Sequence, residues 1–458
     1  MRQLMKHQEQ ALAYALRTQH PAIFLEMRLG KSLTVIRYAG ELGAQAMLVV
    51  APKTVLVSWA KELSLEGQWF HRLQEKAEAD VARLLHRFYG RRPIWFLVNY
   101  ERLRVTPELT KLPWDLVVLD ESTAIKNPQA QITRICAGGA VNRKPFPGFY
   151  AADHRCILSG APMPESEMDL FEQFRFLDGE FAGCTNWFQF RQKYFHQSKF
   201  QENLWHPHQG TAKLVKGLMH SRAFVRTRKQ VGIGPRKIFE VRHVELPAPL
   251  ASAYRQAERD YSVGGAWETK WQIVLQQWLA RMAGGFNPDG EYVSTHKVNE
   301  LVNLLQGELV GEAVVVWFRF LAEMDAVAAR FRQLGWKFAQ VRGETEDRET
   351  PLRRFEEQKI QYLLMQVRVG KYGIDCSAAD TAVYFSNEFS CETRMQSEDR
   401  ILHPQKKAPL LYVDLVTRGT IEEDVLNVLR RKKTNSRLYM RALKEEFERR
   451  LLLEGKRK

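Results

Sequence analysis

Short hydrophobic runs alternate with amphipathic stretches in two separate blocks of the chain. The first block has five such runs and the second has four, at residues 22–26, 46–51, 94–99, 115–120 and 155–159, and at residues 313–318, 361–366, 381–386 and 410–416. Runs of this length, each followed by a helical pattern, are typical of buried parallel strands joined by crossover helices. The pattern therefore predicts an α/β protein with two parallel sheets.

The chain between the two blocks, and after the second one, has a different texture. Residues 165–294 are aromatic, basic and helical in pattern, with Gly/Pro breaks at residues 231–237 and 284–290. The C-terminal residues read as a charged helix. We expect a first sheet domain, helical insertions, a second sheet domain and a basic tail, at residues 1–164, 165–294, 295–428 and 429–458.

The chain carries an excess of positive charge, and this charge is unevenly distributed. The formal net charge is +15 and the isoelectric point is near 9.5. Residues 430–458 hold 12 Lys/Arg against 4 Asp/Glu, and residues 222–242 hold 7 basic residues against one Glu. Such surfaces attract polyanions through the release of counterions, so nucleic acid is the first partner to consider. A solvated helix end is the alternative for the tail.

Composition argues against a membrane protein and against a zinc or disulfide framework. No apolar run approaches the roughly 20 residues that a membrane-spanning helix needs, and the N-terminus lacks the apolar centre of a signal peptide. The five cysteines lie far apart without a CxxC pair, and His206 and His208 have no cysteine or carboxylate close by in the sequence. We expect a cytosolic protein without zinc.

The stretch FLEMRLGKS, residues 24–32, is the first candidate for chemistry. A strand pattern enters it and a helical pattern leaves it, so backbone N–H groups at the helix start would face bound phosphates. Lys31 could reach the β- and γ-phosphates, and the Ser32 hydroxyl could hold Mg²⁺. The strict phosphate-loop pattern places a glycine five residues before Gly30, where this chain has Leu25. An ordinary helix start is the alternative.

An acidic pair follows another hydrophobic run. Asp120 and Glu121 come at its end, where ligands bind in open α/β sheets. Asp120 could hold Mg²⁺ from the side opposite Ser32, while Glu121 could polarise the attacking water. A phosphate-loop lysine and a downstream Asp-Glu pair together predict a nucleoside triphosphatase.

These two motifs belong to an ordered series that resembles the Swi/Snf-like subgroup of superfamily 2 helicases, the DNA-translocating ATPases. EMRLGKS is similar to the family's EMGLGKT, and the resemblance extends over nearly the whole chain. The further segments are LMKHQ (4–8), LVVAPKTVLVSWAKEL (48–63), VNYERL (98–103), LDESTAIKN (119–127), LSGAPMPESEMDLFEQFRFL (158–177), NWFQFRQKYF (186–195), SRAFVRTRKQVGIGPRK (221–237), VVVWFRFLAEMDAV (314–327), VRVGKYGIDCSAADTAVYFS (367–386) and MQSEDRILHPQ (395–405).

The resemblance implies a fold, cofactors and site residues. It implies two RecA-like lobes with helical insertions between them, with ATP and Mg²⁺ in the cleft and DNA lying across both lobes. The implied catalytic residues are Lys31, Asp120, Glu121, Gln396, Arg400 and His403. The implied nucleotide contacts are Gln8, Arg28, Leu29, Gly30, Lys31, Ser32, Gly373 and Asp375, with Ser32 and Asp120 at the metal. The implied DNA contacts are Pro52, Lys53, Thr54, Asn99, Tyr100, Arg226, Arg228, Lys229, Arg368 and Lys371.

Three positions depart from the family pattern. Arg28 stands where the family has glycine, which the loop tolerates if its φ is negative. Asp375 replaces a usual asparagine. His403 replaces the second of two arginines that lie three residues apart, the first being Arg400.

The sequence thus predicts an ATP-dependent double-stranded DNA translocase. A strand-separating or branch-migrating helicase acting on forked or branched DNA is one alternative, and a weakly active ATP- and DNA-binding scaffold is another. The compact length resembles versions from bacteria and their viruses, which implies the cytosol of a bacterial or phage-infected cell. The sequence does not identify a protein partner.

Overall fold

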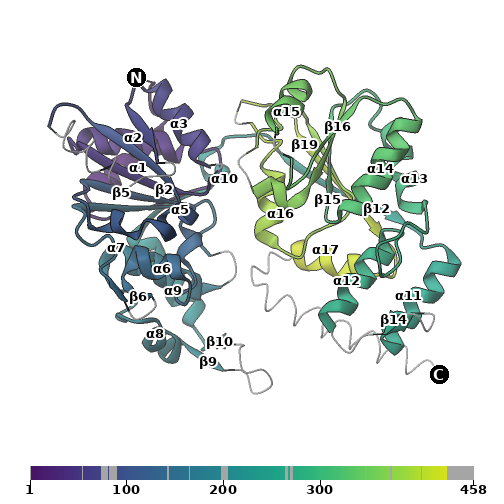
Figure 1. The fold of residues 1–458 in the computed structure, drawn as a ribbon, viewed down its shortest axis with the longest axis horizontal. Helices are drawn as coiled ribbons and strands as arrows, with labels where there is room; N and C mark the ends of the chain where they lie inside the picture. Colours follow the sequence, from purple (N-terminus) through teal and green to yellow (C-terminus); the bar gives the residue numbers. More distant parts are fainter. Residues whose placement is uncertain are drawn as a thin grey trace. The chain divides into compact units, whose positions relative to one another are not determined.

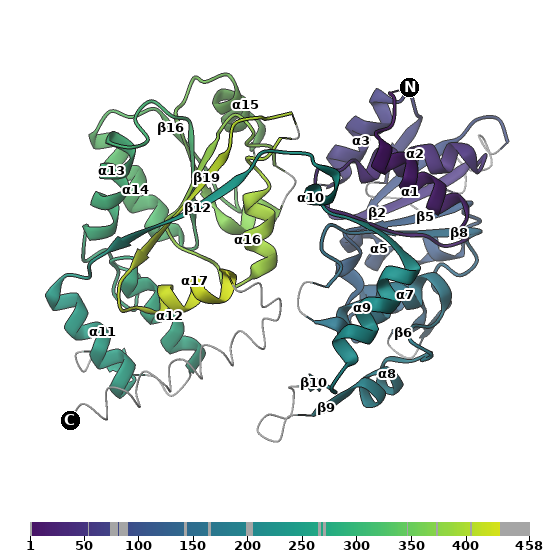
Figure 2. The same ribbon diagram turned by 180° about the vertical axis from the view of Figure 1, so that it is seen from behind.

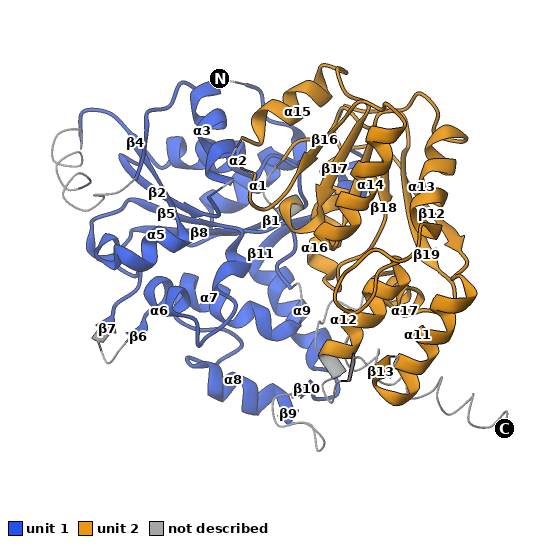
Figure 3. Ribbon diagram, turned by 45° about the vertical axis from the view of Figure 1, so that its right-hand side comes forward, with its two compact units in different colours: residues 1–233 blue, residues 234–458 orange. Residues whose placement is uncertain are grey.

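The chain folds into two compact units, residues 1–233 and residues 234–458, in a computed structural model (Figures 1, 2 and 3). The units are described separately below. The structure describes all residues except 1, 54, 74–80, 82–89, 142–143, 164–165, 198–204, 264–266, 269–271, 346, 372–373, 404 and 431–458.

Unit 1 is built on a seven-stranded sheet in which every strand pairing is parallel. Its central strands are continuously hydrophobic because both faces of the sheet are covered by helices. In spatial order the strands are β11 (Ala223–Arg226), β1 (Ala22–Leu25), β8 (His154–Leu158), β5 (Leu116–Asp120), β2 (Ala46–Ala51), β4 (Ile94–Asn99) and β3 (Phe70–Arg72).

Two hydrophobic cores lie on the two faces of this sheet. Leu48 and Val50 of β2 belong to one core, and Met47 and Val49 belong to the other, as the alternation of side chains along a strand requires. The first core is closed by α5 (Tyr100–Val105), α6 (Gln131–Ala137), α7 (Leu170–Asp178), α8 (Trp187–Tyr194) and α9 (Thr211–Arg222). The second is closed by α1 (Lys6–Leu16), α2 (Lys31–Glu41) and α3 (Val55–Leu65), with α10 (Arg228–Val231) beside them.

Unit 2 repeats this plan with a six-stranded parallel sheet. In spatial order its strands are β12 (Lys237–Val244), β19 (Leu410–Thr417), β18 (Thr381–Tyr384), β15 (Val314–Phe318), β17 (Tyr362–Gln366) and β16 (Phe338–Val341). One face is covered by α13 (His296–Gln306) and α14 (Leu321–Gln333), and the other by α15 (Glu349–Glu356) and α16 (Cys391–Glu398). A third core joins α11 (Ala248–Asp260), α12 (Gln272–Ala283) and α17 (Ile421–Arg430).

All nine predicted strands are confirmed, and so is the fold class of two parallel-sheet lobes. The predicted insertion region, residues 165–294, is shared between the units, because the division falls between residues 233 and 234. Besides helices, this region supplies an edge strand to each sheet, β11 and β12. The predicted tail beyond residue 430 lies outside the described residues.

Two expected absences can be compared with the described part of the chain. There, no helix combines the length and apolar character needed to cross a membrane. Nor do the described residues contain a group of three or more His, Cys, Asp or Glu side chains arranged to hold a metal ion. His196, His206 and His208 do gather around the short β9–β10 hairpin (Phe195–Gln197 and Trp205–Pro207), with ring centroids 5.2 and 5.6 Å from that of His196.

Candidate functional site

The predicted phosphate loop connects β1 to α2 at the carboxyl edge of the unit 1 sheet. Gly30 caps α2 with φ +77°, and the helix begins at Lys31. The first backbone N–H groups of a helix have no partner within the helix, and the helix dipole places partial positive charge there. The loop therefore ends in a potential anion site.

Residues from α1 hold this loop in place. The His7 Nε2 atom lies 2.9 Å from the Leu29 carbonyl oxygen, and Gln8 Nε2 donates to the carbonyls of Leu29 and Gly30 at 3.4 and 3.5 Å. The Gln8 side-chain oxygen, Oε1, accepts from the Met5 N–H at 2.8 Å. Gln8, which the resemblance implies as a nucleotide contact, therefore also supports the loop. A Cβ atom added at Gly30 would lie only 2.0 Å from Gln8 Nε2.

Arg28 takes the left-handed backbone conformation, with φ +67°. The condition under which an arginine would fit this loop, a negative φ, is therefore not met. A left-handed residue with a side chain costs about 1–2 kcal/mol, because Cβ approaches the following carbonyl. The loop therefore has at this position the backbone conformation that a glycine adopts without strain, whereas Arg28 adopts it at this cost in free energy.

Lys31 and Ser32 lie at the start of α2. The Lys31 ammonium donates to the Leu25 carbonyl at 3.0 Å and is close enough to Asp120 to lower the pKa of that carboxyl. Ser32 is partly exposed. A cationic group that faces both the loop and the acidic pair is suited to a triphosphate bound between them.

The acidic pair ends β5, and its aspartate is only 3% exposed. The two oxygens of Asp120 accept from the Trp59 indole N–H at 2.8 Å and from the Glu121 backbone N–H at 2.9 Å. Burial raises the pKa of Asp120, whereas Lys31 and the two hydrogen bonds lower it. Glu121 turns the chain with φ +51°. A buried carboxylate with one cationic neighbour fits a divalent cation, which would offset the cost of burying its charge.

Three supporting residues were not predicted from the sequence. Trp59 of α3 fixes one oxygen of Asp120. The Ser122 hydroxyl donates to the Gln173 side-chain oxygen at 2.6 Å, and Gln173 Nε2 donates to the carbonyls of Pro162 and Asp169. These bonds join the residue after the acidic pair to the 158–177 segment. The sequence contains one indication of these three residues, which is that each lies in a segment that resembles the family.

The catalytic candidates of unit 2 lie on and after α16. Gln396 Nε2 donates to Glu392 Oε1 at 3.2 Å, while its Oε1 atom is buried without a hydrogen-bond partner among the described residues. Arg400 is 5% exposed, and its carbonyl accepts from the Cys376 N–H at 2.9 Å. His403 Nδ1 accepts from the Gln405 N–H at 3.3 Å.

The two remaining nucleotide candidates of unit 2 precede β18. Asp375 accepts from the Ser377 N–H at 2.9 Å, which stabilises the turn before that strand. Gly373 lies outside the described residues.

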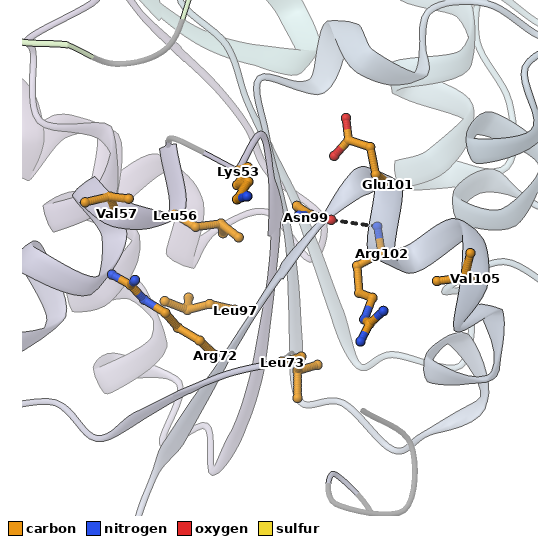
Figure 4. Close-up of a pocket in the computed structure, with 10 residues that line it drawn as sticks. All are labelled: Lys53, Leu56, Val57, Arg72, Leu73, Leu97, Asn99, Glu101, Arg102 and Val105. Carbon is orange, nitrogen blue, oxygen red and sulfur yellow. Dashed lines mark hydrogen bonds between the residues drawn. The ribbon is translucent and has the colours of Figure 1, made fainter. Parts of the chain in front are cut away.

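A pocket of about 580 Å³ lies at the carboxyl ends of β2 and β4, between α3 and α5 (Figure 4). It contains two predicted DNA contacts, Lys53 and Asn99. Asn99 Oδ1 caps α5 by accepting from the Arg102 N–H at 2.6 Å. The other lining residues are Leu56, Val57, Arg72, Leu73, Leu97, Glu101, Arg102 and Val105. Arg72 and Arg102, which were not predicted as DNA contacts, add positive charge to this pocket.

The neighbouring DNA candidates have structural contacts of their own. The Pro52 carbonyl accepts from the N–H groups of Val55 and Leu56 at the start of α3, and Thr54 lies outside the described residues. Tyr100 is buried, and its hydroxyl donates to the Asp120 carbonyl at 2.9 Å. Its side chain thus lies beneath the acidic pair and not on the surface.

The basic candidates around β11 and in unit 2 differ in their surroundings. Arg226 stacks on Phe224, with its guanidinium 4.5 Å from the ring centroid. Arg228 pairs with Glu26 beside the phosphate loop, whereas Lys229 is exposed. Arg368 is exposed and lies 3.3 Å from Glu388. Lys371 ends the turn at Val367–Lys371 that follows β17.

Two parallel-sheet lobes, one with a phosphate loop and an acidic pair at its carboxyl edge, are the architecture of a helicase-like ATPase. The SNF2-related domain matches residues 7–282, which is more than half of the chain, and the helicase conserved C-terminal domain matches residues 296–404. The chain belongs to the SNF2-related family.

Its curated relatives are longer proteins. It is 23% identical to Protein CHROMATIN REMODELING 4 of Arabidopsis thaliana, over 97% of this chain and 21% of that protein. It is also 23% identical to the Bacillus subtilis protein that bears the name "Putative ATP-dependent helicase/translocase YwqA", over 89% of this chain and 45% of that protein. The chain thus spans less than half of the length of either relative.

One solved structure aligns with nearly the whole chain. The Sulfolobus solfataricus SWI2/SNF2 ATPase core in complex with dsDNA is 18% identical, with a TM-score of 0.44, over 96% of this chain and 94% of that one.

Proposed function

We propose that this protein is an ATP-dependent double-stranded DNA translocase, a motor that uses Mg²⁺-ATP hydrolysis to move along DNA or to remodel protein–DNA complexes. The observation that carries the proposal is the placement of Lys31, at the start of α2, within electrostatic reach of the buried Asp120. Together with membership of the SNF2-related family, this arrangement supports nucleotide hydrolysis as the source of motion.

Each residue of unit 1 would have a distinct task. The α2 N-terminus and Lys31 would bind the β- and γ-phosphates, and Ser32 and Asp120 would hold Mg²⁺. When bound, the metal would neutralise charge that develops on the phosphate oxygens. Glu121 would orient the attacking water and accept its proton. Trp59 keeps the Asp120 carboxylate in a fixed orientation, so that little reorganisation is needed when ligands bind.

Unit 2 would complete the reaction. Gln396 is one of the residues proposed for this task, and its side-chain oxygen is buried without a hydrogen-bond partner among the described residues. Arg400 is another, and it would stabilise the charge of the transferring phosphoryl group. Because the Arg400 side chain is nearly buried in unit 2, we expect residues 396–403 to rearrange when nucleotide binds. A rearrangement of this kind on ligand binding is a common way to make hydrolysis depend on a conformational step.

Duplex DNA would bind in part at the pocket of Figure 4, which carries the cations of Lys53, Arg72 and Arg102. Lysine and arginine contacts to phosphate position a duplex without reading its sequence, which suits a motor that must move over any sequence. We expect duplex DNA to stimulate hydrolysis more than single-stranded DNA or RNA.

Two substitutions test the proposal directly. Lys31→Ala should reduce DNA-stimulated ATP turnover to background and leave duplex binding nearly intact, because the lysine contacts phosphate of the nucleotide. Glu121→Gln should still bind Mg²⁺-ATP but hydrolyse it at least about a hundredfold more slowly, the range for loss of a general base. The exposed Lys61→Ala of α3 is the matched control. Turnover at the wild-type rate in either site variant would contradict this active site.

A catalytically weak scaffold is the second candidate function. It is favoured by the strained Arg28 and by the histidine at position 403, where the family pattern has a second arginine. An ATPase assay with and without duplex DNA separates the motor from the scaffold. Strand-displacement assays on forked and branched DNA then separate a translocase from an unwinding helicase. The protein target and a cytosolic, bacterial or phage setting remain predictions.

A further inference from the structure

A short segment joins the two units, and both of its ends are anchored by cations. The units divide between Ile233 and Gly234, and the segment includes Gly232 and Gly234 with φ of +70° and +97°. Before it, β11 forms one edge of the unit 1 sheet, and after it β12 forms one edge of the unit 2 sheet. The glycines allow this segment to change direction, so its fixed points are the two anchors on either side.

The first anchor joins the segment to the phosphate loop. The Arg228 backbone N–H donates to Glu26 Oε2 at 2.8 Å, and its guanidinium lies 2.5 Å from Glu26 Oε1. A second guanidinium nitrogen donates to the Met27 carbonyl at 3.3 Å. Directly before these contacts, the Glu26 N–H donates to the Arg226 carbonyl at 3.0 Å. Both side chains are largely shielded from solvent, at 11% and 26% exposure.

The second anchor joins the segment to the residues before Arg400. The Lys237 ammonium lies 3.0 Å from Glu398 Oε2 and 3.0 Å from Asp399 Oδ1. Glu398 is the last residue of α16, whose C-terminal carbonyls favour a nearby cation. The Tyr412 hydroxyl donates to the Glu398 carbonyl at 2.8 Å, which fixes the same turn from β19.

From these contacts we infer that Arg228 and Lys237 are positioning residues for ATP hydrolysis. Arg228 holds the phosphate loop of unit 1 in its binding conformation. Lys237 holds the C-terminal end of α16 and thereby fixes the position of Arg400, which comes directly after Asp399 in the chain. The inference rests on the proposed function. It assigns to one connecting segment two residues, each of which holds a part of the proposed site within its own unit.

The sequence positions of the anchors support this task. Glu26 and Met27 immediately precede Arg28 in the loop, and Asp399 immediately precedes Arg400. Ion pairs on an open surface contribute little and are readily lost, but these pairs are shielded and involve two acceptors each. Arg236 lies in the same segment with an exposed side chain, and its backbone carbonyl pairs with Leu410. It offers a control of equal charge.

Amide hydrogen exchange of the full chain, without nucleotide or DNA, tests the anchors independently of activity. In Arg228→Ala, exchange at residues 26–30 should become faster by about tenfold or more, whereas residues 396–403 should change little. In Lys237→Ala, exchange at residues 396–403 should become faster by about tenfold or more, whereas residues 26–30 should change little. Arg236→Ala should alter neither region. Unchanged exchange at both regions, or the same changes in Arg236→Ala, would overturn the inference.

Kinetics then distinguish positioning from general support of the fold. Arg228→Ala should weaken binding of a fluorescent ADP analogue, measured without DNA, by about tenfold or more, since the loop contacts the ground-state phosphates. Lys237→Ala should lower kcat by about tenfold or more with a nearly unchanged KM for ATP, because a misplaced Arg400 acts only in the transition state. The conservative variants Arg228→Lys and Lys237→Arg should recover part of each loss.

These outcomes separate the inference from the proposed function. A wild-type protein that binds ATP but never hydrolyses it would overturn the motor proposal and the catalytic task of Lys237 together. An active wild type whose Arg228→Ala and Lys237→Ala variants keep normal analogue affinity and kcat would overturn the inference alone.

Discussion

Arg28 and Gly30 share the left-handed backbone conformation although only one of them is a glycine. The sequence named Lys31, Ser32, Asp120 and Glu121 as candidates from their residue types, and the structure places Lys31 close enough to Asp120 to act on its pKa. The roles of all four residues stay predictions. The sequence could not reveal the positive φ of Arg28, since an arginine gives no sign of that conformation. Contacts such as Trp59 with Asp120 join residues far apart in the chain, and no local pattern reports them.

Arg28→Gly tests the strain in the phosphate loop. Glycine adopts a positive φ without the Cβ clash but loses more chain entropy on folding, so the net gain in unfolding free energy should be at most about 1 kcal/mol. Urea unfolding of the full chain provides the measurement. Gly30→Ala is the opposite control and should destabilise the loop, because its Cβ would meet Gln8. If Arg28→Gly instead lowers stability, the contacts of the arginine side chain outweigh its backbone strain.

His403→Arg tests whether the sixth motif limits turnover. A histidine presents one ring nitrogen to a phosphate and carries charge only when it is protonated, whereas arginine stays charged and can bond two phosphate oxygens at once. DNA-stimulated kcat should therefore rise several-fold in His403→Arg and fall in His403→Ala, as measured by steady-state ATPase assays between pH 6 and 8. Equal rates for all three proteins would leave Arg400 as the only cationic contributor from this motif.

Strand order explains which elements the sequence predicted and which it missed. The nine predicted strands include every interior strand of both sheets, and these read as continuous hydrophobic runs because both of their faces are covered. Within these two sheets, the four strands that were missed are β3, β11, β12 and β16, and they are the four edges. Edge strands meet solvent on one side and carry polar residues, as in the β12 sequence KIFEVRHV. Their pattern therefore resembles that of the surrounding loops.

Three elements of unit 2 meet at a buried charge cluster. Lys297 of α13 is fully buried and lies 2.5 Å from Glu422 of α17. Glu323 of α14 accepts from the Ser386 hydroxyl and from the Phe320 N–H. Burial raises the pKa of Glu323 to about 7, although Lys297 and the Ser386 hydrogen bond lower it and Glu422 raises it. This carboxyl therefore takes up a proton on folding near neutral pH.

Glu323→Gln should remove a pH-dependent part of the stability of unit 2. Because the folded pKa is raised above the ordinary value of 4.5, the contribution of Glu323 is fully present below about pH 4.5 and is lost as the pH rises through 7. The loss amounts to at most about 3.5 kcal/mol, from roughly 1.4 kcal/mol per pKa unit over the rise from 4.5 to about 7. In urea unfolding, the variant should match wild type near pH 5 and exceed it near pH 8. Glu356→Gln, at an exposed position of α15, should show no such gain.

At the scale of the whole molecule, the sequence predicted two lobes and an excess of positive charge, but not where the lobes divide. The division at residues 233 and 234 falls inside the region predicted as insertions. Two edge strands in that region each join a different sheet, and strand pairing between distant segments cannot be inferred from the local sequence pattern. The basic tail stays a prediction, because residues 431–458 lie outside the described part of the chain.

DNA affinity should fall steeply with salt, with a log–log slope of about −0.9 for each phosphate that the protein neutralises. Lys53→Ala and Arg102→Ala, both at the pocket of Figure 4, should each flatten the slope by about one such contact. Fluorescence anisotropy on a duplex over a salt series provides the measurement, with the exposed Lys61→Ala as control. Deletion of residues 431–458 should flatten the slope further if the tail contacts DNA. Unchanged slopes would place these cations away from the duplex.

The pairing of β12 with β19 has a consequence for protein synthesis. β12 is the first strand of unit 2 to be made, yet it joins its sheet through β19, the last strand, in register from Lys237 with Leu410 to Val244 with Thr417. At about 5–20 residues per second, β19 leaves the ribosome on the order of ten seconds later. The strands of unit 1 are all complete once β11 has emerged. We therefore expect unit 1 to fold on the ribosome, while β12 stays unpaired and must be kept from other strands until β19 has emerged.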